Sequence, residues 1–197
     1  MTPFQQSFQV EFLGPFRVAT GNTVSGFDVA VSDDPLPSTS LKGAMRATAR
    51  RLIGAGHPLI AEVFGSEGDG GAWAWTSADF SQCSLSLSGR SRIAIDPATK
   101  TVVESALVRA QHYEVTNAAT AIFHVEPLQR VPESRVDDHL VLLRASALGT
   151  QSVGSDRNRG FGWVRVTADG VTNDQVLDLA KAVLTLSAET RTTGSAS

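Results

Sequence analysis

The chain has 197 residues, of which 42% are hydrophobic, enough to close the core of one domain. Its 17 basic and 20 acidic side chains give a net charge of -3, which excludes the chain-wide basic field of a free DNA-binding protein. The one cysteine, Cys83, excludes an internal disulfide framework and a cysteine-cluster metal site. No apolar run approaches a membrane span, so we expect a cytoplasmic protein with no membrane partner.

The first predicted element is a strand at residues 8–12, where Phe8, Val10 and Phe12 alternate with polar residues. Glycines, prolines and polar residues then predict a surface loop over residues 20–37, which contains Asp28. Loops of this length in a compact domain are often functional.

A helix is predicted over residues 41–53, with Ser38 or Ser40 as its cap and glycines at its end. Basic side chains recur along one side of this helix at four-residue spacing: Lys42, Arg46 and Arg50. Such a stripe is either a solvated face or a surface that awaits an anion, because an anion would relieve the repulsion between the like charges.

The middle of the chain is rich in predicted strands. A short helix at residues 57–64 and a glycine-rich loop precede a strand that carries Trp73 and Trp75. Residues 90–104 predict a projecting β-hairpin with its turn at Asp96–Lys100. Two more strands, at residues 107–115 and 121–125, are expected to flank a turn at Asn117.

The C-terminal third predicts helix, strand and helix. Apolar spacing predicts a helix from Ser134 to just before Gly149, and a glycine- and arginine-rich loop, residues 154–162, leads into a strand at residues 163–166. Thr172 and Gln175 can form a capping box for the last helix.

This element order predicts an α+β fold with a ferredoxin-like core, in which helices cover one face of an antiparallel sheet. We expect one domain over residues 1–188, with the hairpin at 90–104 inserted into it, and a disordered tail at 189–197.

The residues favour phosphate contact over hydrolytic or metal chemistry. There is no G-x-S-x-G elbow, and the four histidines lack metal-ligand spacing. The helix start offers amide groups, hydroxyls and cations, and the later loop offers guanidinium groups and bare backbone. The predicted contacts are Ser38, Ser40, Lys42, Arg46, Arg50, Gly154, Arg157, Arg159, Gly160 and Gly162. Two such elements favour a nucleic-acid strand. Trp73, Trp75 and Trp163 are expected to pack in the core, and contact with bases is the alternative.

Several motifs resemble those of the RAMP superfamily. Residues 37–46, PSTSLKGAMR, are similar to its I-P-G-S-S-L-K-G-x-x-R motif, and residues 154–162, GSDRNRGFG, resemble its C-terminal glycine-rich loop. Residues 64–66 resemble its L-F-G-S step. Residues 92–101, RIAIDPATKT, resemble the hairpin of the repeated backbone subunit of type III CRISPR complexes.

The resemblance implies a cytoplasmic subunit of a multisubunit antiviral complex. Its partners would be guide RNA, complementary target RNA, other RAMP subunits and copies of itself, and the hairpin would act as a thumb that displaces a base. It further implies that Asp28 supports cleavage of target RNA with a divalent cation, Mg²⁺ or Mn²⁺. The alternatives are a non-catalytic structural subunit and a stand-alone endoribonuclease that processes guide precursor.

Overall fold

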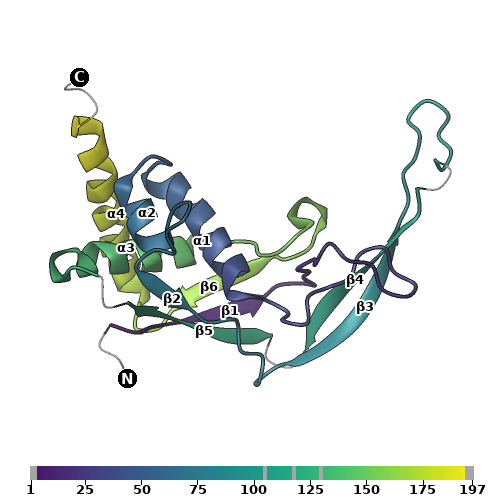
Figure 1. Cartoon of the computed structure of the whole chain (residues 1–197), viewed down its shortest axis with the longest axis horizontal. Helices are drawn as coiled ribbons and strands as arrows, with labels where there is room; N and C mark the ends of the chain where they lie inside the picture. Colours follow the sequence, from purple (N-terminus) through teal and green to yellow (C-terminus); the bar gives the residue numbers. More distant parts are fainter. Residues whose placement is uncertain (1–3, 104–105, 117–118, 129–130, 194–197) are drawn as a thin grey trace.

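The computed structural model describes residues 4–103, 106–116, 119–128 and 131–193 of the chain. A helix-covered sheet forms one end of the molecule, and a long two-stranded hairpin projects from the other (Figure 1). Within the described residues, no helix is long and apolar enough to cross a membrane.

The main sheet has the predicted ferredoxin-like arrangement. Its four strands are β1 (Gln6–Phe12), β2 (Trp73–Trp75), β5 (Thr120–Pro127) and β6 (Val164–Ala168). They are antiparallel, in the order β2-β5-β1-β6. One helix, α1 (Ser38–Ile53), follows β1, and another, α3 (Val136–Leu148), connects β5 to β6. Each helix crosses over a central strand, which is the split βαβ pattern.

The helices lie on one face of this sheet, where they bury its apolar side chains (Figure 1). The remaining helices are α2 (Pro58–Phe64), α4 (Asn173–Thr193) and the 3₁₀ turns η1 (Glu133–Arg135) and η2 (Arg157–Arg159). Alternate residues of β1 and β5 meet the helix stripes in the core, which includes Phe8, Val10, Phe123, Leu41, Met45, Leu142 and Leu143.

Helix α1 begins earlier than predicted, at Ser38, and the expected serine caps are absent. Its N-cap residue is Pro37, whose backbone is extended and whose side chain makes no capping hydrogen bond to the helix. The Ser38 N–H donates instead to Ser77 Oγ at 3.2 Å. A hydroxyl from the segment after β2 therefore caps the helix, a long-range contact that local sequence does not show.

The inserted hairpin is longer than predicted. Strands β3 (Ser84–Arg92) and β4 (Val108–Thr116) pair along their whole length, from Ser84 opposite Thr116 to Arg92 opposite Val108. Beyond them the predicted turn is present, with Lys100 N–H donating to Asp96 O at 2.9 Å. We call the hairpin from Ser84 to Thr116 the thumb.

The strands predicted at 107–115 and 121–125 are present as β4 and β5, but they do not pair with each other, because they belong to different sheets. β4 pairs with β3, whereas β5 pairs with β1 and β2. The buried side chains Ala121, Phe123 and Val125 account for this, since only the main sheet offers them a core. Asn117 lies outside the described residues.

Helix α4 starts at the predicted capping box, with Thr172 N–H donating to Gln175 Oε1 at 3.0 Å. It continues to Thr193, beyond the start of the segment for which the sequence predicted disorder. Residues 194–197 lie outside the described residues.

Buried polar side chains connect β2, α2 and α3. Trp73, which packs in the core as predicted, donates from Nε1 to His139 Nδ1 at 2.9 Å. His139 therefore carries its proton on Nε2, which donates to Glu62 Oε2 at 3.1 Å. Burial raises the pKa of Glu62, but the hydrogen bonds from Arg135 and His139 outweigh it, so the pKa lies below its ordinary value.

We predict that Glu62→Gln lowers the free energy of unfolding near neutral pH and that this difference shrinks on acidification. A carboxylate with a depressed folded pKa stabilises the fold above its unfolded pKa and loses that effect as pH falls through the folded value. Urea unfolding at pH values from about 7 to about 3 measures the effect, with Glu126→Gln, exposed on β5, as the control. A difference that stays constant with pH would contradict the assignment.

Candidate nucleic-acid interface

Helix α1 and the glycine-rich loop line three neighbouring pockets that share lining residues, and we call them together the groove. Its three lobes have volumes of about 290, 580 and 190 Å³, and Arg157 lines all of them. The first lobe, which we call the anion lobe, includes Thr39, Ser40 and Gly43 from α1 together with Gly154 and Ser155 from the loop. Two stretches more than a hundred residues apart in sequence therefore lie together, as the sequence proposed.

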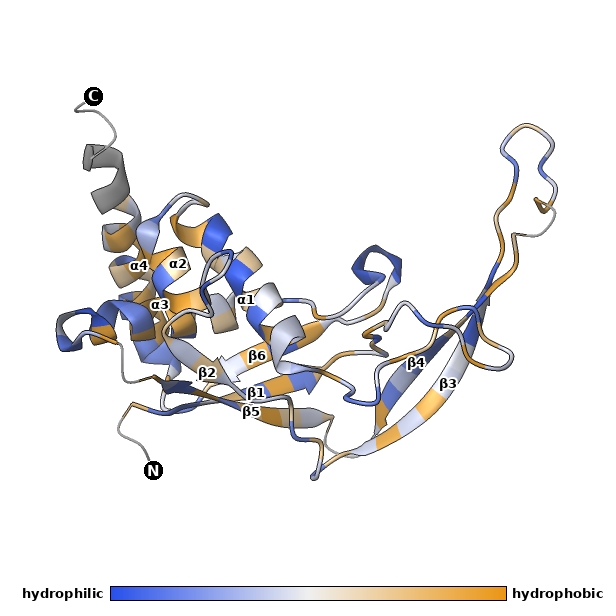
Figure 2. Ribbon diagram, in the orientation of Figure 1, coloured by the Kyte–Doolittle hydropathy of each residue, from blue (hydrophilic) through white to orange (hydrophobic). Residues whose placement is uncertain are grey.

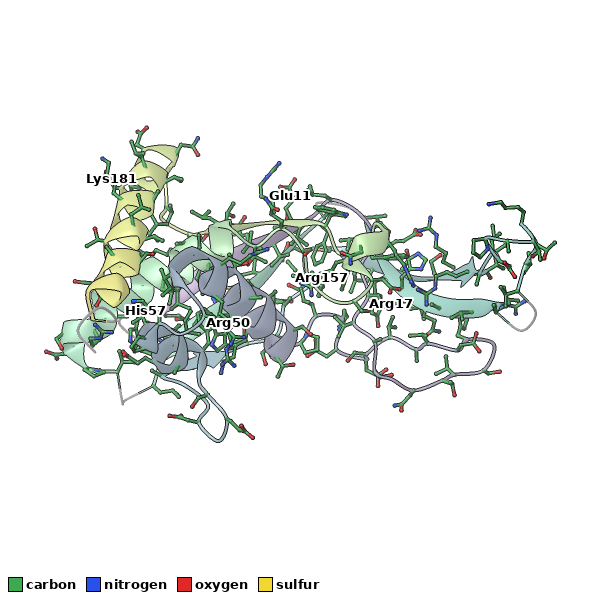
Figure 3. All side chains as sticks on the ribbon, turned by 90° about the horizontal axis from the view of Figure 1, so that it is seen from above. Glu11, Arg17, Arg50, His57, Arg157 and Lys181 are labelled. Carbon is green, nitrogen blue, oxygen red and sulfur yellow. The ribbon has the colours of Figure 1, made fainter. Side chains whose placement is uncertain are left out.

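The predicted basic stripe lies on a different flank of α1. Lys42 Nζ donates to the carbonyl oxygen of Gly70 at 2.6 Å, in the loop that follows α2. At 3.6 residues per turn, Lys42, Arg46 and Arg50 lie about a third of a turn from the helix face that lines the groove. Figure 3 accordingly shows Arg50 and Arg157 on different sides of α1.

Arg51 is the α1 cation that faces the groove, and the sequence analysis missed it. It lines the second and third lobes, and its Nη2 donates to Thr48 Oγ1 at 2.9 Å. A signal was present: Ser40, Ala44, Ala47 and Arg51 recur at spacings of four, three and four, a stripe of small residues that ends in a cation. Gly43 and Ala47 are exposed and small, so a ligand backbone can approach this face of the helix closely.

Close backbone packing fixes the path of the glycine-rich loop. Gly154 and Gly162 have φ angles of +75° and +72°, and a Cβ on either would collide with the carbonyl oxygen of Arg17 or Val153. Gly160 has a φ angle of +83° and open space around it, so the backbone conformation, and not a lack of space, favours glycine at this position. Gly154 thus lets the loop lie directly on the segment after β1, and Gly162 lets the two ends of the loop pack together.

Asp156, at the centre of this loop, brings three arginines together. Its Oδ2 contacts Arg17 Nη2 and lies 2.9 Å from Arg92 Nη1, and its Oδ1 lies 3.7 Å from Arg159 Nη1. Arg17 is only 4% exposed, and burial, together with the charges of Arg92 and Arg159, lowers its pKa. We call these four residues the Asp156 cluster. It has three guanidinium groups to one carboxylate, so its charge is positive.

An aromatic ring adds a second connection between the loop and the thumb. Phe161 lies 5.7 Å from Arg17 and 5.5 Å from Arg90, measured from ring centroid to guanidinium carbon, and His112 meets it edge-on. Arg90 is on β3 and His112 on β4, so both thumb strands contact the loop that forms the groove.

Asp28 lies in the exposed loop before α1. Its Oδ2 accepts a hydrogen bond from the Arg109 N–H at 2.7 Å, and its own N–H donates to the Arg109 carbonyl at 2.8 Å. The loop is thus fixed to β4. Over the described ranges, no three His, Cys, Asp or Glu side chains are grouped so as to hold a metal ion.

The tryptophans divide between core and surface. Two of them pack against the core, as predicted. Trp73 is buried, and the Trp75 ring stacks on Phe123 with the ring centroids 6.2 Å apart. The core prediction is wrong for Trp163, which is 49% exposed and lines the third lobe of the groove. Trp163 directly precedes β6, whose alternating burial begins with Val164 inward, so the indole ring is left outside the core.

We predict that Asp156→Asn lowers the free energy of unfolding by about 3 kcal/mol, because buried Arg17 would lose its counter-charge beside two other arginines. Urea unfolding measures this loss. Asp178→Asn, which breaks an exposed pair with Lys181, should cost less than about 0.5 kcal/mol. Equal losses in the two variants would contradict the role given to Asp156.

Comparison with known proteins identifies the fold and the family of the chain. Two solved chains, described as "Type III-B Cmr-beta Cryo-EM structure of the Apo state" and "Cryo-EM structure of the Type III-B Cmr-beta bound to cognate target RNA", share the fold at 12% identity and a TM-score of 0.62. The matches cover 85% and 89% of this chain and 98% of each solved chain. No curated protein sequence matches significantly. The family model of the RAMP superfamily matches residues 9–165, and the chain belongs to this superfamily.

Proposed function

We propose that this chain is a backbone subunit of a type III CRISPR interference complex and binds guide RNA in antiviral defence. Membership of the RAMP superfamily supports the proposal. So does the fold shared with chains of a type III-B complex, one of which was solved with cognate target RNA. Such a subunit would contact other RAMP subunits and copies of itself.

The groove between α1 and the glycine-rich loop carries the proposal. The first turn of α1 has no acidic residue, so the positive end of the helix dipole favours an anion in the anion lobe. Arg51 and Arg157 supply guanidinium groups along the same groove, and the small residues of α1 allow a ribose-phosphate backbone to approach closely. Three neighbouring lobes offer room for more than one phosphate, which suits a strand better than a single small anion.

The basic stripe extends the positive surface to the other flank of α1. Arg46 and Arg50 form no ion pair within the part of the chain that the structure describes, and Arg50 is exposed. RNA that crosses the exposed residues Gly43 and Ala47 would reach both flanks. In this proposal the groove and the stripe contact successive phosphates.

The thumb supports a role in displacing a base. Both arms of its distal part carry hydrophobic residues (Figure 2). They are at least 42% exposed: Ile93, Ile95, Val102, Val103 and Leu107. Apolar side chains on a projecting hairpin suit insertion between bases, because they remain exposed to solvent rather than buried.

Target cleavage is the finer part of the proposal and rests on Asp28. One oxygen of its carboxylate is engaged by Arg109, and the other can accept the proton of a target 2′-hydroxyl. The 2′-oxygen would then bond to phosphorus as the bond to the 5′-oxygen breaks, which leaves a 2′,3′-cyclic phosphate and a 5′-oxygen that takes a proton from water. A single carboxylate fits a divalent cation, Mg²⁺ or Mn²⁺, whose other ligands are RNA phosphates and water. Such an ion would stabilise charge on the phosphate.

The proposal predicts the RNA that the protein carries and the cuts that it makes. The tagged chain isolated from its own cells should bring down RNA made of CRISPR spacers and repeat fragments, identified by sequencing. The isolated complex, given labelled complementary RNA and Mg²⁺, should make evenly spaced cuts. Asp28→Asn should abolish the cuts while target binding persists, and Asp33→Asn, exposed in the same loop, should cut as the unchanged protein does.

Each part of the experiment can fail separately. Absence of spacer RNA would refute the backbone role. Cutting that survives in Asp28→Asn would refute the catalytic role of that residue and leave the binding role intact. Metal-independent cleavage of precursor RNA by the isolated chain would favour the processing endoribonuclease.

A further inference from the structure

The third lobe of the groove has a chemistry of its own. It is a concave site of about 190 Å³, which we call the Trp163 lobe. Its lining residues are Ala44, Ala47, Thr48, Arg51, Gln151, Ser152, Arg157 and Trp163. An aromatic ring, two guanidinium groups and small residues of α1 therefore face one space, next to the site proposed for phosphates.

The backbone holds Trp163 firmly although its side chain is half exposed. Its carbonyl oxygen accepts from the Leu13 N–H at 2.9 Å, and it forms a bridge with Ser152. The next residue, Val164, donates to the Gln151 carbonyl at 3.0 Å. A large aromatic side chain presented to solvent from a fixed backbone contributes little to the core, and it is ready to cover a flat apolar partner without loss of loop entropy.

We propose that the Trp163 lobe binds a nucleobase of the RNA by stacking it on the Trp163 indole ring. The inference rests on the proposed function and names a further contact within the same groove. Because Arg157 lines both the anion lobe and the Trp163 lobe, a nucleotide can place its phosphate in the first and its base in the second. The cationic groups beside the ring add favourable contact with a base and its phosphate.

The polar groups at the edge of the lobe predict little base selectivity. The Gln151 side chain is exposed and offers both a donor and an acceptor, so it can pair with the edge of any base. The Thr48 hydroxyl already lies 3.1 Å from the Thr150 hydroxyl and accepts from Arg51 at 2.9 Å, so it is engaged within the protein. Stacking tolerates every base, which suits a subunit that must carry guides of any sequence.

The test compares two ligands, a labelled single-stranded RNA of mixed sequence and an abasic ribose-phosphate chain of the same length, on the full-length protein. Trp163→Ala should weaken RNA binding roughly tenfold, the effect of losing one stacked base, and should leave binding of the abasic chain unchanged. Trp163→Phe keeps an aromatic face, and its RNA affinity should stay within about threefold of the unchanged protein. RNA, but not the abasic chain, should quench indole fluorescence, and Trp163→Phe should remove that quenching.

Three results would overturn the inference. Equal weakening of both ligands by Trp163→Ala would mean that the residue only supports the loop. Full RNA affinity in Trp163→Ala would mean that no base stacks there. If the unchanged protein bound neither ligand, the proposed RNA-binding function would fail, and the stacking site with it, whereas either of the first two results leaves that function standing.

Discussion

A buried guanidinium group requires a counter-charge, and in this chain Arg17 finds it in Asp156. The pair joins the segment after β1 to the glycine-rich loop, and Arg92 on the same carboxylate joins that loop to the thumb at the distal end of β3. Gly154 and Gly162 allow the approach, because a side chain on either would collide with a carbonyl oxygen. The position of the loop over α1, and therefore the groove itself, depends on this contact.

The Asp156 cluster also explains how an acidic protein can offer a positive site. The chain has a net charge of -3, yet three arginines share one carboxylate beside the groove, and Arg51 and Arg157 lie along it. Acidic side chains lie elsewhere, for example Glu11 paired with Arg165, and Asp178 with Lys181. Salt screens surface charges beyond about 10 Å, so a ligand close to the groove experiences the local excess of cations rather than the net charge of the chain.

Local patterns in the sequence predicted most of the fold. Alternation at residues 8–12 and apolar spacing in α1 and α3 predicted those elements, because each buries one face against the same core. Local patterns could not predict contacts between residues distant in the chain. Three features depend on such contacts: the Ser77 cap of α1, the pairing of β4 with β3, and the outward position of Trp163. The same limit applies to the site. Four-residue spacing identified the Lys42 stripe, but only the folded chain shows that Arg51 is the α1 cation facing Arg157.

The most direct test of the account is the salt dependence of RNA binding when the groove loses its two cations. The quantity measured is the slope of log K against log salt concentration, where K is the association constant for single-stranded RNA. In the double variant Arg51→Ala with Arg157→Ala, this slope should become shallower by about 1.4. The change is about 0.7 for each phosphate that the protein no longer neutralises. Arg165→Ala with Lys181→Ala removes the same charge from exposed sites outside the groove and should leave the slope unchanged. Equal slopes in the two double variants would contradict the claim that α1 and the glycine-rich loop form one track for RNA.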